Sequence, residues 1–336
     1  MSTTIGDLVD RVYREYLEPP ESVESYSYLT GGVTTTTQST INYEESMFST
    51  EEEDALGAGT IIEVGQELMF SKSLNAVTNE ITVQRGARGT TATLHSAGDI
   101  IKIAPAFPRK NVFDAISDQI ENLYPTLFAV ETKTLTSGTG YRIIGDYGTD
   151  SDNNNYLVAP IKAISQYTDF NAGNDETGLK FIGVAVEMVD LPNGFTWTDE
   201  DGTERTKTYT SGPQVVHALQ FQGIASGYEC YVTFKKKFIA PTSETTTLTS
   251  VGLETEYEPI VMAGVAAQMV AVKDISKLDA KYITEQIAVS NAPIGSSNSL
   301  RNSLLQYQQL LIQQARKNLR AKYPEPVTLN SINYPT

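Results

Sequence analysis

The sequence has very few of the residues that build disulfide frameworks and metal centres. Its 336 residues include one cysteine and two histidines. A single thiol excludes an intrachain disulfide, and so few thiols and imidazoles argue against a cysteine/histidine zinc site. Long apolar runs are also missing: no segment approaches the ~20 apolar residues of a membrane-spanning helix, and the charged N-terminus lacks a signal-peptide core. We therefore expect a soluble protein with no membrane partner.

Positive charge is the next scarce property. The chain has 25 Lys+Arg against 41 Asp+Glu, a formal net charge of −16. This balance argues against a general nucleic-acid binder, because phosphate contacts need Lys and Arg. The charge is uneven: it is −10 over residues 1–60, +2 over 61–112, −12 over 113–295 and +4 over 296–336. An acidic head and a basic tail suit head-to-tail stacking of copies or docking onto an oppositely charged partner; plain solvated faces are an equal alternative.

Helices are predicted near both ends and in the middle of the chain. Helical spacing of apolar residues, N-terminal caps and terminating prolines mark them. Thr3 or Thr4 is the expected cap of the first, and Gly264 with neighbouring alanines in the third permits close approach of another helix. The five segments are Thr4–Leu17, Arg109–Leu123, Tyr257–Val272, Asp279–Val289 and Ser299–Lys322.

Strand patterns fill the two intervals between the helices. In 24–104 an exposed threonine-rich strand is expected at Thr34–Thr37 with Ile41 and Tyr43, followed by four short apolar strands, which is typical of a small β-barrel or sandwich. These four are Thr60–Val64, Glu67–Ser71, Ile81–Arg85 and Ile100–Ala104. In 130–252 seven strands separated by Gly, Asn and Asp turns indicate an antiparallel sandwich. They are Val130–Leu135, Tyr141–Ile144, Tyr156–Val158, Ile161–Tyr167, Lys180–Val189, Val215–Phe221 and Cys230–Phe234.

The predicted fold class is therefore α+β. A helical body is interrupted by a small β-barrel-like insertion and by a larger antiparallel β-sandwich, because the apolar helix faces need one another as partners. The predicted parts are the N-terminal helix 1–23, the small β domain 24–104, a helix of the body 105–129, the sandwich 130–252, the C-terminal helices 253–323 and an extended C-terminal arm 324–336.

No catalytic constellation stands out. The chain lacks a G-x-S-x-G elbow, a P-loop, a dinucleotide-binding fingerprint and an H-E-x-x-H motif, and its only imidazoles are His95 and His217. Oxygen-rich stretches at Asp152–Asn155 and Asn174–Glu176 are better explained as turns than as Ca²⁺ sites. We predict no enzyme activity, no cofactor and no metal.

Three other features have a structural and a functional interpretation. Cys230 sits in an aromatic strand, which favours a buried thiol over a nucleophile. Trp197 either packs on its own hairpin or binds a sugar or a partner. The run Lys235–Lys237 either blunts a strand edge or contacts phosphates or an acidic neighbour.

The most specific segment is 60–104. Gly86 and Gly89 permit a tight turn after the strand 81–85, and His95 is expected to fix a second turn by bonding to the backbone. The residues that define these turns are Arg85, Gly86, Gly89, Thr90, His95 and Gly98.

This segment resembles a pattern that recurs in structural proteins of tailed bacteriophages. There a strand with vG-x-x-(L/M)-x-(F/I) precedes V-x-RG-x-x-GT-x-a-x-x-H-x-x-G-x-x-(I/V). The matching residues are Val64, Gly65, Leu68, Phe70, Val83, Arg85, Gly86, Gly89, Thr90, Ala92, His95, Gly98 and Ile101. The match covers about 40 residues, and similar elements occur in neck, baseplate and fibre proteins. Together with the helical plan, the chain looks most like a head-to-tail adaptor, or connector, of the neck.

The resemblance implies a structural virion protein at the head–tail interface, assembled in the bacterial cytoplasm. It implies a homo-oligomeric ring of about twelve copies, a portal protein above it, a further neck or tail protein below it, and genomic DNA that passes without sequence-specific binding. The residues that would reach the portal are Arg316, Lys317, Arg320, Lys322 and the arm behind them.

Two other classes remain open. The chain may be read as a tail fibre, receptor-binding or neck-decorating protein, with the 130–252 sandwich and Trp197 as its adhesive part. A virion-associated glycan hydrolase would use a pair of carboxylates, although no pattern selects a pair.

Overall fold

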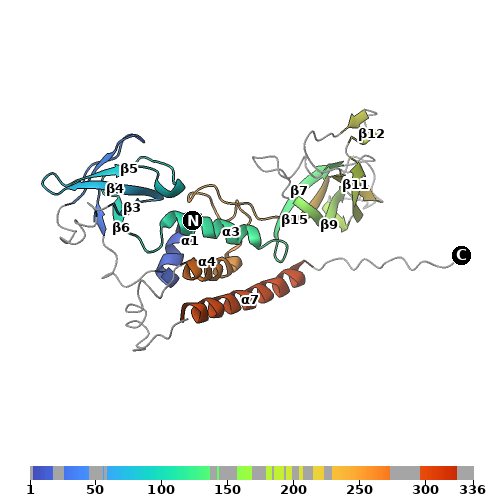
Figure 1. Cartoon of the computed structure of the whole chain (residues 1–336). Helices are drawn as coiled ribbons and strands as arrows, with labels where there is room; N and C mark the ends of the chain where they lie inside the picture. Colours follow the sequence, from blue (N-terminus) through green and yellow to red (C-terminus); the bar gives the residue numbers. More distant parts are fainter. Residues whose placement is uncertain are drawn as a thin grey trace. The chain divides into compact units, whose positions relative to one another are not determined.

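The structure is a computed structural model that contains both helices and antiparallel sheets, which confirms the mixed α+β class (Figure 1). It describes residues 3–17, 26–44, 56, 59–136, 142–143, 157–168, 179–183, 185–192, 194–198, 204–206, 215–222, 229–272 and 296–323. The predicted helix 279–289, the arm 324–336 and the oxygen-rich stretches 152–155 and 174–176 lie outside these residues. The chain forms two compact units. The first comprises Met1–Gln119, Pro241–Thr247 and Glu258–Gln309, and the second comprises Ile120–Ala240, Leu248–Tyr257 and Leu310–Thr336.

The first unit begins with helix α1 (Ile5–Val12), which continues as a π-helical turn, η1 (Tyr13–Leu17). Thr4 is the N-cap: its hydroxyl accepts from the Asp7 amide, and the Asp7 carboxylate accepts from the Thr4 amide. This capping box satisfies two backbone donors that a helix start leaves open. The predicted helix 4–17 and its cap are confirmed, and the apolar stripe of α1 is fully buried.

A curled six-stranded antiparallel sheet forms the β part of the first unit (Figure 1). Its strands are β1 (Tyr26–Tyr28), β2 (Thr40–Asn42), β3 (Ile61–Val64), β4 (Glu67–Asn75), β5 (Glu80–Gln84) and β6 (Ile100–Ile103). They follow the order β1-β6-β3-β4-β5-β2, so sequence neighbours β3, β4 and β5 pair as a meander. One face buries an apolar cluster that includes Ile62, Met69, Val83 and Ile101. The four predicted apolar strands are confirmed.

One predicted strand of this part is wrong. The segment Thr34–Thr37 is a turn, in which the Gln38 side chain accepts from the Thr34 amide and the Gln38 amide donates to the Thr35 carbonyl. The strand begins only at Thr40. Threonine hydroxyls and a nearby amide side chain stabilise turns as readily as strands, and this local hydrogen bonding outweighs the β propensity of the run.

Helix α4 (Glu258–Val272) is the most deeply buried helix among the described residues. The predicted helices 109–123, 257–272 and 299–322 are confirmed as α3 (Arg109–Asn122), α4 and α7 (Ser296–Lys322), and η4 (Thr255–Tyr257) precedes α4. We predicted a single apolar face on α4, but its residues 260–267 are all nearly inaccessible. An all-round apolar surface fits a helix with neighbours on several sides. Within the described residues, no helix combines the length and apolar character needed to cross a membrane.

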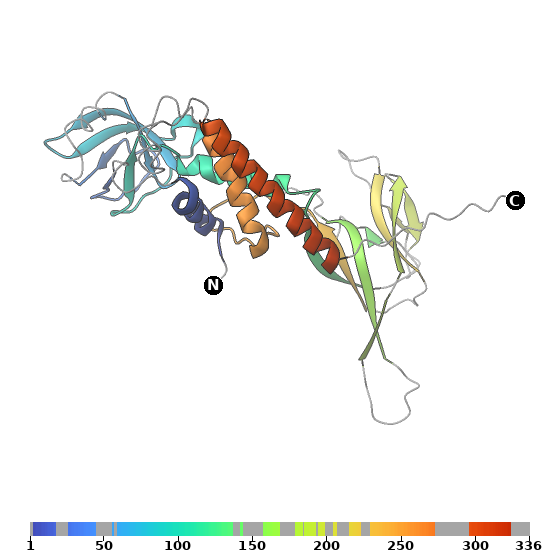
Figure 2. The same cartoon turned by 90° about the horizontal axis from the view of Figure 1, so that it is seen from below.

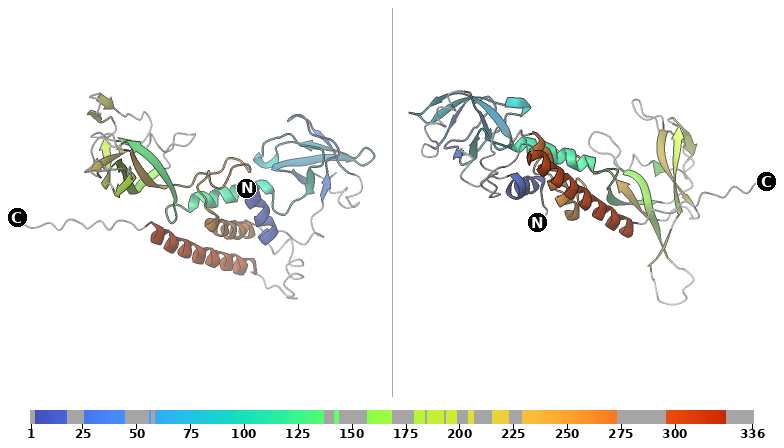
Figure 3. Two further views of the ribbon diagram at one scale, coloured as in Figure 1. Left: turned by 180° about the vertical axis from the view of Figure 1, so that it is seen from behind. Right: turned by 60° about the horizontal axis from the view of Figure 1, so that its bottom comes forward.

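Three glutamines connect α4 to its neighbours within the first unit. Gln119 of α3 donates to the side chain of Gln268 (3.3 Å), and Gln308 of α7 donates to Gln119 (2.9 Å) and to the Ile260 carbonyl (3.2 Å). Gly264 makes room for them, because a Cβ at this position would lie 2.2 Å from Gln119 Oε1. The first part of α7 therefore runs alongside α4 (Figures 2 and 3), as the small residues of α4 predicted.

Arg109, the first residue of α3, joins the sheet to the helices. Its guanidinium binds the Glu244 carboxylate through two bonds of 2.8 Å and binds Asp10 of α1 at 2.6 Å. Its backbone amide donates to the carboxylate of Glu63 on β3 (2.5 Å), which therefore caps the start of α3. Burial would lower the pKa of the guanidinium, but the hydrogen bonds that it donates to Glu244 and Asp10 raise that pKa above its usual value.

The segment 241–247 completes the start of α1. The amide of Ile5 donates to the Thr246 carbonyl and that of Gly6 donates to the Glu244 carbonyl, each at 2.9 Å. Two amides that open a helix thus find partners in a segment far along the sequence. The same segment supplies Glu244 to Arg109, so it ties α1 and α3 together.

The described residues of the second unit form three further antiparallel sheets. A four-stranded sheet has the order β10-β9-β15-β7, a three-stranded sheet has the order β11-β14-β8, and β12 pairs with β13. The strands are β7 (Ala129–Thr136), β8 (Arg142–Ile143), β9 (Leu157–Thr168), β10 (Leu179–Gly183), β11 (Ala185–Pro192), β12 (Thr196–Thr198), β13 (Glu204–Thr206), β14 (Val215–Gln222) and β15 (Glu229–Lys236).

Two predicted boundaries in the second unit are wrong. The segments Tyr156–Val158 and Ile161–Tyr167 form one strand, β9, because Pro160 sits beside a register shift in the pairing with β15. A proline lacks an amide donor and is tolerated at such an irregularity. In contrast, Lys180–Val189 is split between β10 and β11, which belong to different sheets.

Replacement of Arg109 by methionine should lower the free energy of unfolding by about 2–3 kcal/mol, because it removes charge-assisted bonds to two carboxylates. Chemical unfolding followed by circular dichroism measures this change. Lys110→Met is the matched control: Lys110 is the next residue and its exposed pair with Asp114 should contribute less than about 0.5 kcal/mol. Equal effects of the two substitutions would contradict the assignment.

Candidate functional site

The motif residues of segment 60–104 surround one buried carboxylate, that of Glu67 at the start of β4. Oε1 accepts from Arg85 Nε (2.6 Å) and from the Gly86 amide (3.0 Å). Oε2 accepts from Arg85 Nη2 (2.6 Å) and the Thr93 amide (2.9 Å), and it lies 2.9 Å from His95 Nε2. An ionised carboxylate can only accept, so the imidazole donates here. We call Glu67, Arg85 and His95 the carboxylate cluster.

The electrostatics of the carboxylate cluster are those of a satisfied ion pair. The Glu67 side chain is 0% exposed and that of Arg85 is 7% exposed. Burial alone would raise the pKa of the Glu67 carboxyl, but the bonds from Arg85, Thr93, His95 and Gly86 outweigh burial and lower its pKa to about 2. Five donors occupy both oxygens, so Glu67 has no free lone pair with which to bind a substrate or accept a proton. The cluster serves to hold the loop 85–95 on β4.

The glycines and Thr90 shape the loop that carries these donors. Gly86 has φ +63°, and a Cβ there would lie 2.9 Å from the Thr90 carbonyl oxygen, so only glycine fits this turn. Gly89 and Gly98 also have positive φ angles. The Thr90 hydroxyl accepts from the Leu68 amide (3.0 Å) and donates to the Ala87 carbonyl (2.8 Å). The predicted turns are present, and Thr90 fastens the first turn to β4.

The expected hydrogen-bond partner of the His95 side chain, the backbone of the turn, is wrong. Its ring bonds to the Glu67 carboxylate rather than to the backbone. The backbone of His95 does form a two-way bridge, with the amide and carbonyl of Val33. A buried carboxylate attracts every available donor around it, which explains why the ring turns inward.

Glu67 was not among the residues singled out in the sequence. The residues that carry the resemblance include Leu68 and Phe70, whereas Glu67, next to Leu68, is the residue that binds the others of the site. Its only sequence signal is a lone carboxylate at the start of a strand, followed by three apolar residues, with an arginine directly after the next strand. That signal does not identify partners 18 and 28 residues away.

The four proposed portal-contacting residues lie on the last turns of α7. All of Arg316, Lys317, Arg320 and Lys322 are exposed. Lys322 lies 3.8 Å from Glu254 in an exposed pair, and the other three have no ion-pair partner within the described residues. The carboxylate cluster and this basic helix end are separate sites, because the first lies in the loop after β5 and the second at the end of α7.

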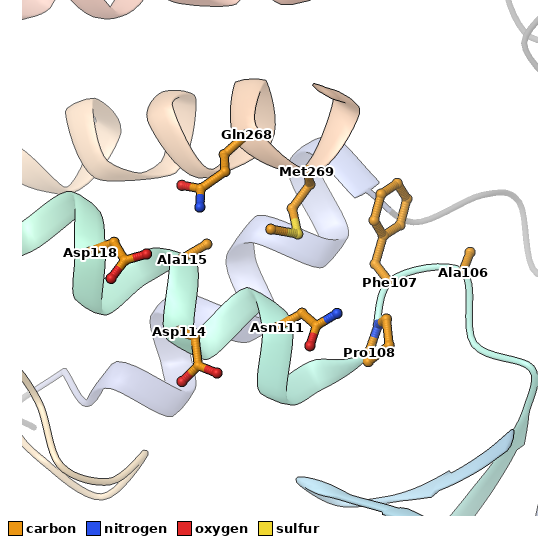
Figure 4. A pocket seen from close by; sticks show the side chains of 9 residues that line it. All are labelled: Ala106, Phe107, Pro108, Asn111, Asp114, Ala115, Asp118, Gln268 and Met269. Atoms are coloured by element: carbon orange, nitrogen blue, oxygen red, sulfur yellow. The ribbon is translucent and has the colours of Figure 1, made fainter. Parts of the chain in front are cut away.

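A hollow of about 240 Å³ opens between α3 and α4 (Figure 4). Figure 4 shows side chains of α3 along one side and Gln268 and Met269 of α4 along the other. Its apolar lining consists of Ala106, Phe107, Pro108, Ala115 and Met269, and its polar lining of Asn111, Asp114, Asp118 and Gln268. We call this the α3–α4 hollow. It lacks the convergent polar groups of an enclosed small-molecule site.

The remaining candidates receive structural explanations where the structure describes them. Cys230 is a buried free thiol, as predicted. Within the run Lys235–Lys237, Lys236 binds Glu131 (2.8 Å), and the other two ammonium groups lie over aromatic rings. The side chains of Trp197 and His217 lie outside the described residues. In the part of the chain that the structure describes, no three acidic, histidine or cysteine side chains gather to hold a metal ion.

Replacement of Glu67 by glutamine should lower the free energy of unfolding by about 3–5 kcal/mol, because it leaves the buried Arg85 guanidinium without its counter-charge. Chemical unfolding measures this loss. Glu44→Gln is the control, since Glu44 is an exposed carboxylate of the same β part and its replacement should change stability by less than about 0.5 kcal/mol. A small effect at Glu67 would contradict a structural role for the cluster.

The stability that Glu67 contributes should depend on pH in a defined direction. Its pKa falls from 4.5 to about 2 on folding, so its contribution is complete above pH ~4.5 and is lost as the pH falls towards ~2. The measured quantity is the difference in free energy of unfolding between the natural protein and Glu67→Gln. We expect this difference to shrink through that window; a constant difference from pH 5 to pH 2 would show that Glu67 is not a low-pKa group.

Comparison with known proteins gives no relative. No protein-family model matches the chain, and no curated protein is significantly similar to it. Functional interpretation therefore depends on the residues and geometry described above.

Proposed function

We propose that this chain is a structural protein of a tailed-bacteriophage virion, a head-to-tail adaptor of the neck that forms a ring beneath the portal. The observation that carries the proposal is the basic end of α7. Arg316, Lys317 and Arg320 project from a long helix without acidic partners in the described chain, and Lys322 has only an exposed pair. Such a cationic helix end is suited to an acidic patch on another protein.

The buried carboxylates of the first unit are engaged in hydrogen bonds within the fold. This supports a structural protein over a virion-associated glycan hydrolase. A hydrolase needs two carboxyl groups free to exchange protons with substrate. Glu67 instead has both oxygens engaged by five donors and is inaccessible to solvent. Glu63 caps α3 and Glu258 binds Arg11 of α1. The most buried carboxylates of the first unit thus hold elements together.

The arrangement of helices supports the same proposal. In this proposal α1, α3, α4 and α7 are the helical body of the subunit. The six-stranded sheet is the small β-barrel-like insertion, and the sheets of the second unit are the larger antiparallel sandwich. Helices that pack through short polar bridges, such as the one between Gln308 and Gln119, give the rigid body that ring assembly requires.

The charge of the chain suits a DNA conduit. A net charge of −16 repels phosphate, so a ring of such subunits lets genomic DNA pass without holding it. The proposed partners are further copies of the chain, about twelve by resemblance, the portal, and the next neck or tail protein. The proposed location is the neck of the virion, after assembly in the bacterial cytoplasm.

Electron microscopy and native mass measurement test the proposal directly. The purified chain is examined alone and after mixing with the portal protein of the same virion. A closed ring that binds the portal supports the adaptor. An elongated trimer that binds host cells would support a fibre or receptor-binding protein and would overturn the adaptor proposal. A monomer that does not bind the portal would also overturn it.

Charge reversal at Arg316 and Arg320 should weaken portal binding at least tenfold at low salt, because both guanidinium groups lie on one face of α7 and face the acidic partner. Surface binding measurements with immobilised portal give the affinity. Arg301→Glu, an exposed arginine at the other end of the same helix, is the control and should leave binding within twofold. Unchanged affinity of the double variant would refute the role of the helix end.

A further inference from the structure

The middle of α7 carries an exposed apolar stripe that ends in a positive charge. Leu310 is 64% exposed and Tyr307 is 46% exposed, and Leu310 is the most exposed large apolar side chain on any described helix. With 3.6 residues per turn, Tyr307, Leu310, Gln314 and Lys317 fall on one side of the helix over about 15 Å. We call Tyr307, Leu310 and Lys317 the α7 stripe.

The four basic residues of α7 do not share this side. Around the helix axis Lys317 lies within about 20° of Leu310, whereas Arg320 is about 80° and Arg316 about 120° away. Lys322 already has Glu254 as an exposed neighbour. The end of α7 therefore has two different surfaces available for contacts: one carries Leu310 and Lys317, and the other carries Arg316 and Arg320.

The α3–α4 hollow has the complementary chemistry. Its floor is apolar, with Ala115, Phe107 and Met269, and its rim carries the carboxylates of Asp114 and Asp118 (Figure 4). Asp114 is paired with Lys110 of its own helix. Asp118 is exposed and has no ion-pair partner within the described residues. An exposed leucine next to a lysine fits an apolar hollow next to an unpaired aspartate.

We propose that the α7 stripe of one copy docks in the α3–α4 hollow of a second copy of this chain. Leu310 enters the hollow against Met269 and Ala115, and Lys317 pairs with Asp118. The contact joins two different surfaces, so it is heterologous, and repetition of a heterologous contact closes into a ring or continues as a filament. This inference deepens the proposed function and rests on it only for the closure of the ring.

Single substitutions test each surface in the full-length chain. Leu310→Asp and Lys317→Asp alter the α7 stripe, and Asp118→Lys alters the hollow. Each should weaken self-association at least tenfold in sedimentation velocity, while the circular dichroism spectrum stays unchanged because all three side chains are exposed. Leu94→Asp is the matched control, since Leu94 has the same exposure, 63%, in the β part, and it should leave assembly unchanged.

Combined variants test that the two surfaces meet. The double variant Lys317→Asp/Asp118→Lys exchanges the two charges and should restore at least part of the assembly that each single change removes. A mixture of Leu310→Asp chains with Asp118→Lys chains retains one intact hollow and one intact stripe. It should therefore stop at one-to-one dimers, whereas the natural chain should form assemblies larger than a dimer, which a symmetric contact would not produce.

The outcomes separate this inference from the proposed function. If the natural chain assembles, alone or on the portal, and Leu310→Asp and Asp118→Lys assemble equally well, the interface is overturned and the ring proposal stands. If the natural chain remains a monomer alone and with the portal, both are overturned. Loss of assembly in the single variants, with rescue by charge exchange, supports the interface.

Discussion

The first unit depends on the ionic contacts of one arginine. Arg109 opens α3, and through its side chain and amide it reaches α1, the segment 241–247 and β3. An arginine fork suits this task because it donates in several fixed directions and remains charged when partly buried. Loss of this side chain would leave Glu244 and Asp10 near one another without a cation, and α1, α3 and the segment 241–247 would lose the ionic contact that they share. The bond from the Arg109 amide to Glu63 on β3 would remain.

A second buried ion pair performs a comparable task inside the sheet. The Glu67 carboxylate accepts from Arg85 and Gly86 in the turn after β5 and from Thr93 and His95 further along the loop. The two networks share a principle: a single charge, satisfied from several chain segments, fixes loops that cannot form a regular ladder. The turn motif of segment 60–104 is thereby explained as a structural element of the fold. The exposed charged side chains described above as having no ion-pair partner among the described residues, such as Asp118 and Lys317, lie on the helices α3 and α7.

Local sequence patterns predicted most helices and strands, whereas the ion pairs between residues far apart in the sequence could not be predicted. Apolar periodicity, Thr4 with Asp7, and the prolines after the helices act over a few residues, so α1, α3 and α7 were placed from sequence. The cluster of Glu67 with Arg85 and His95, and the pair of Arg109 with Glu244, join positions 18 to 135 residues apart. Their selection is decided by tertiary packing. The basic end of α7 was found because charge alone marks it; the α3–α4 hollow was missed because two helices must meet to form it.

The bonds between the start of α1 and the segment 241–247 have a consequence for the order of events during synthesis. The amides of Ile5 and Gly6 have no partners until the carbonyls of Glu244 and Thr246 are synthesised. These carbonyls are translated after all the described strands, the last of which, β15, ends at Lys236. Contacts of such long sequence separation form late. The N-terminal helix of a nascent chain thus remains unfinished until nearly three quarters of the protein exists. The described β strands of the second unit all precede residue 241, so they are synthesised before the first unit can close.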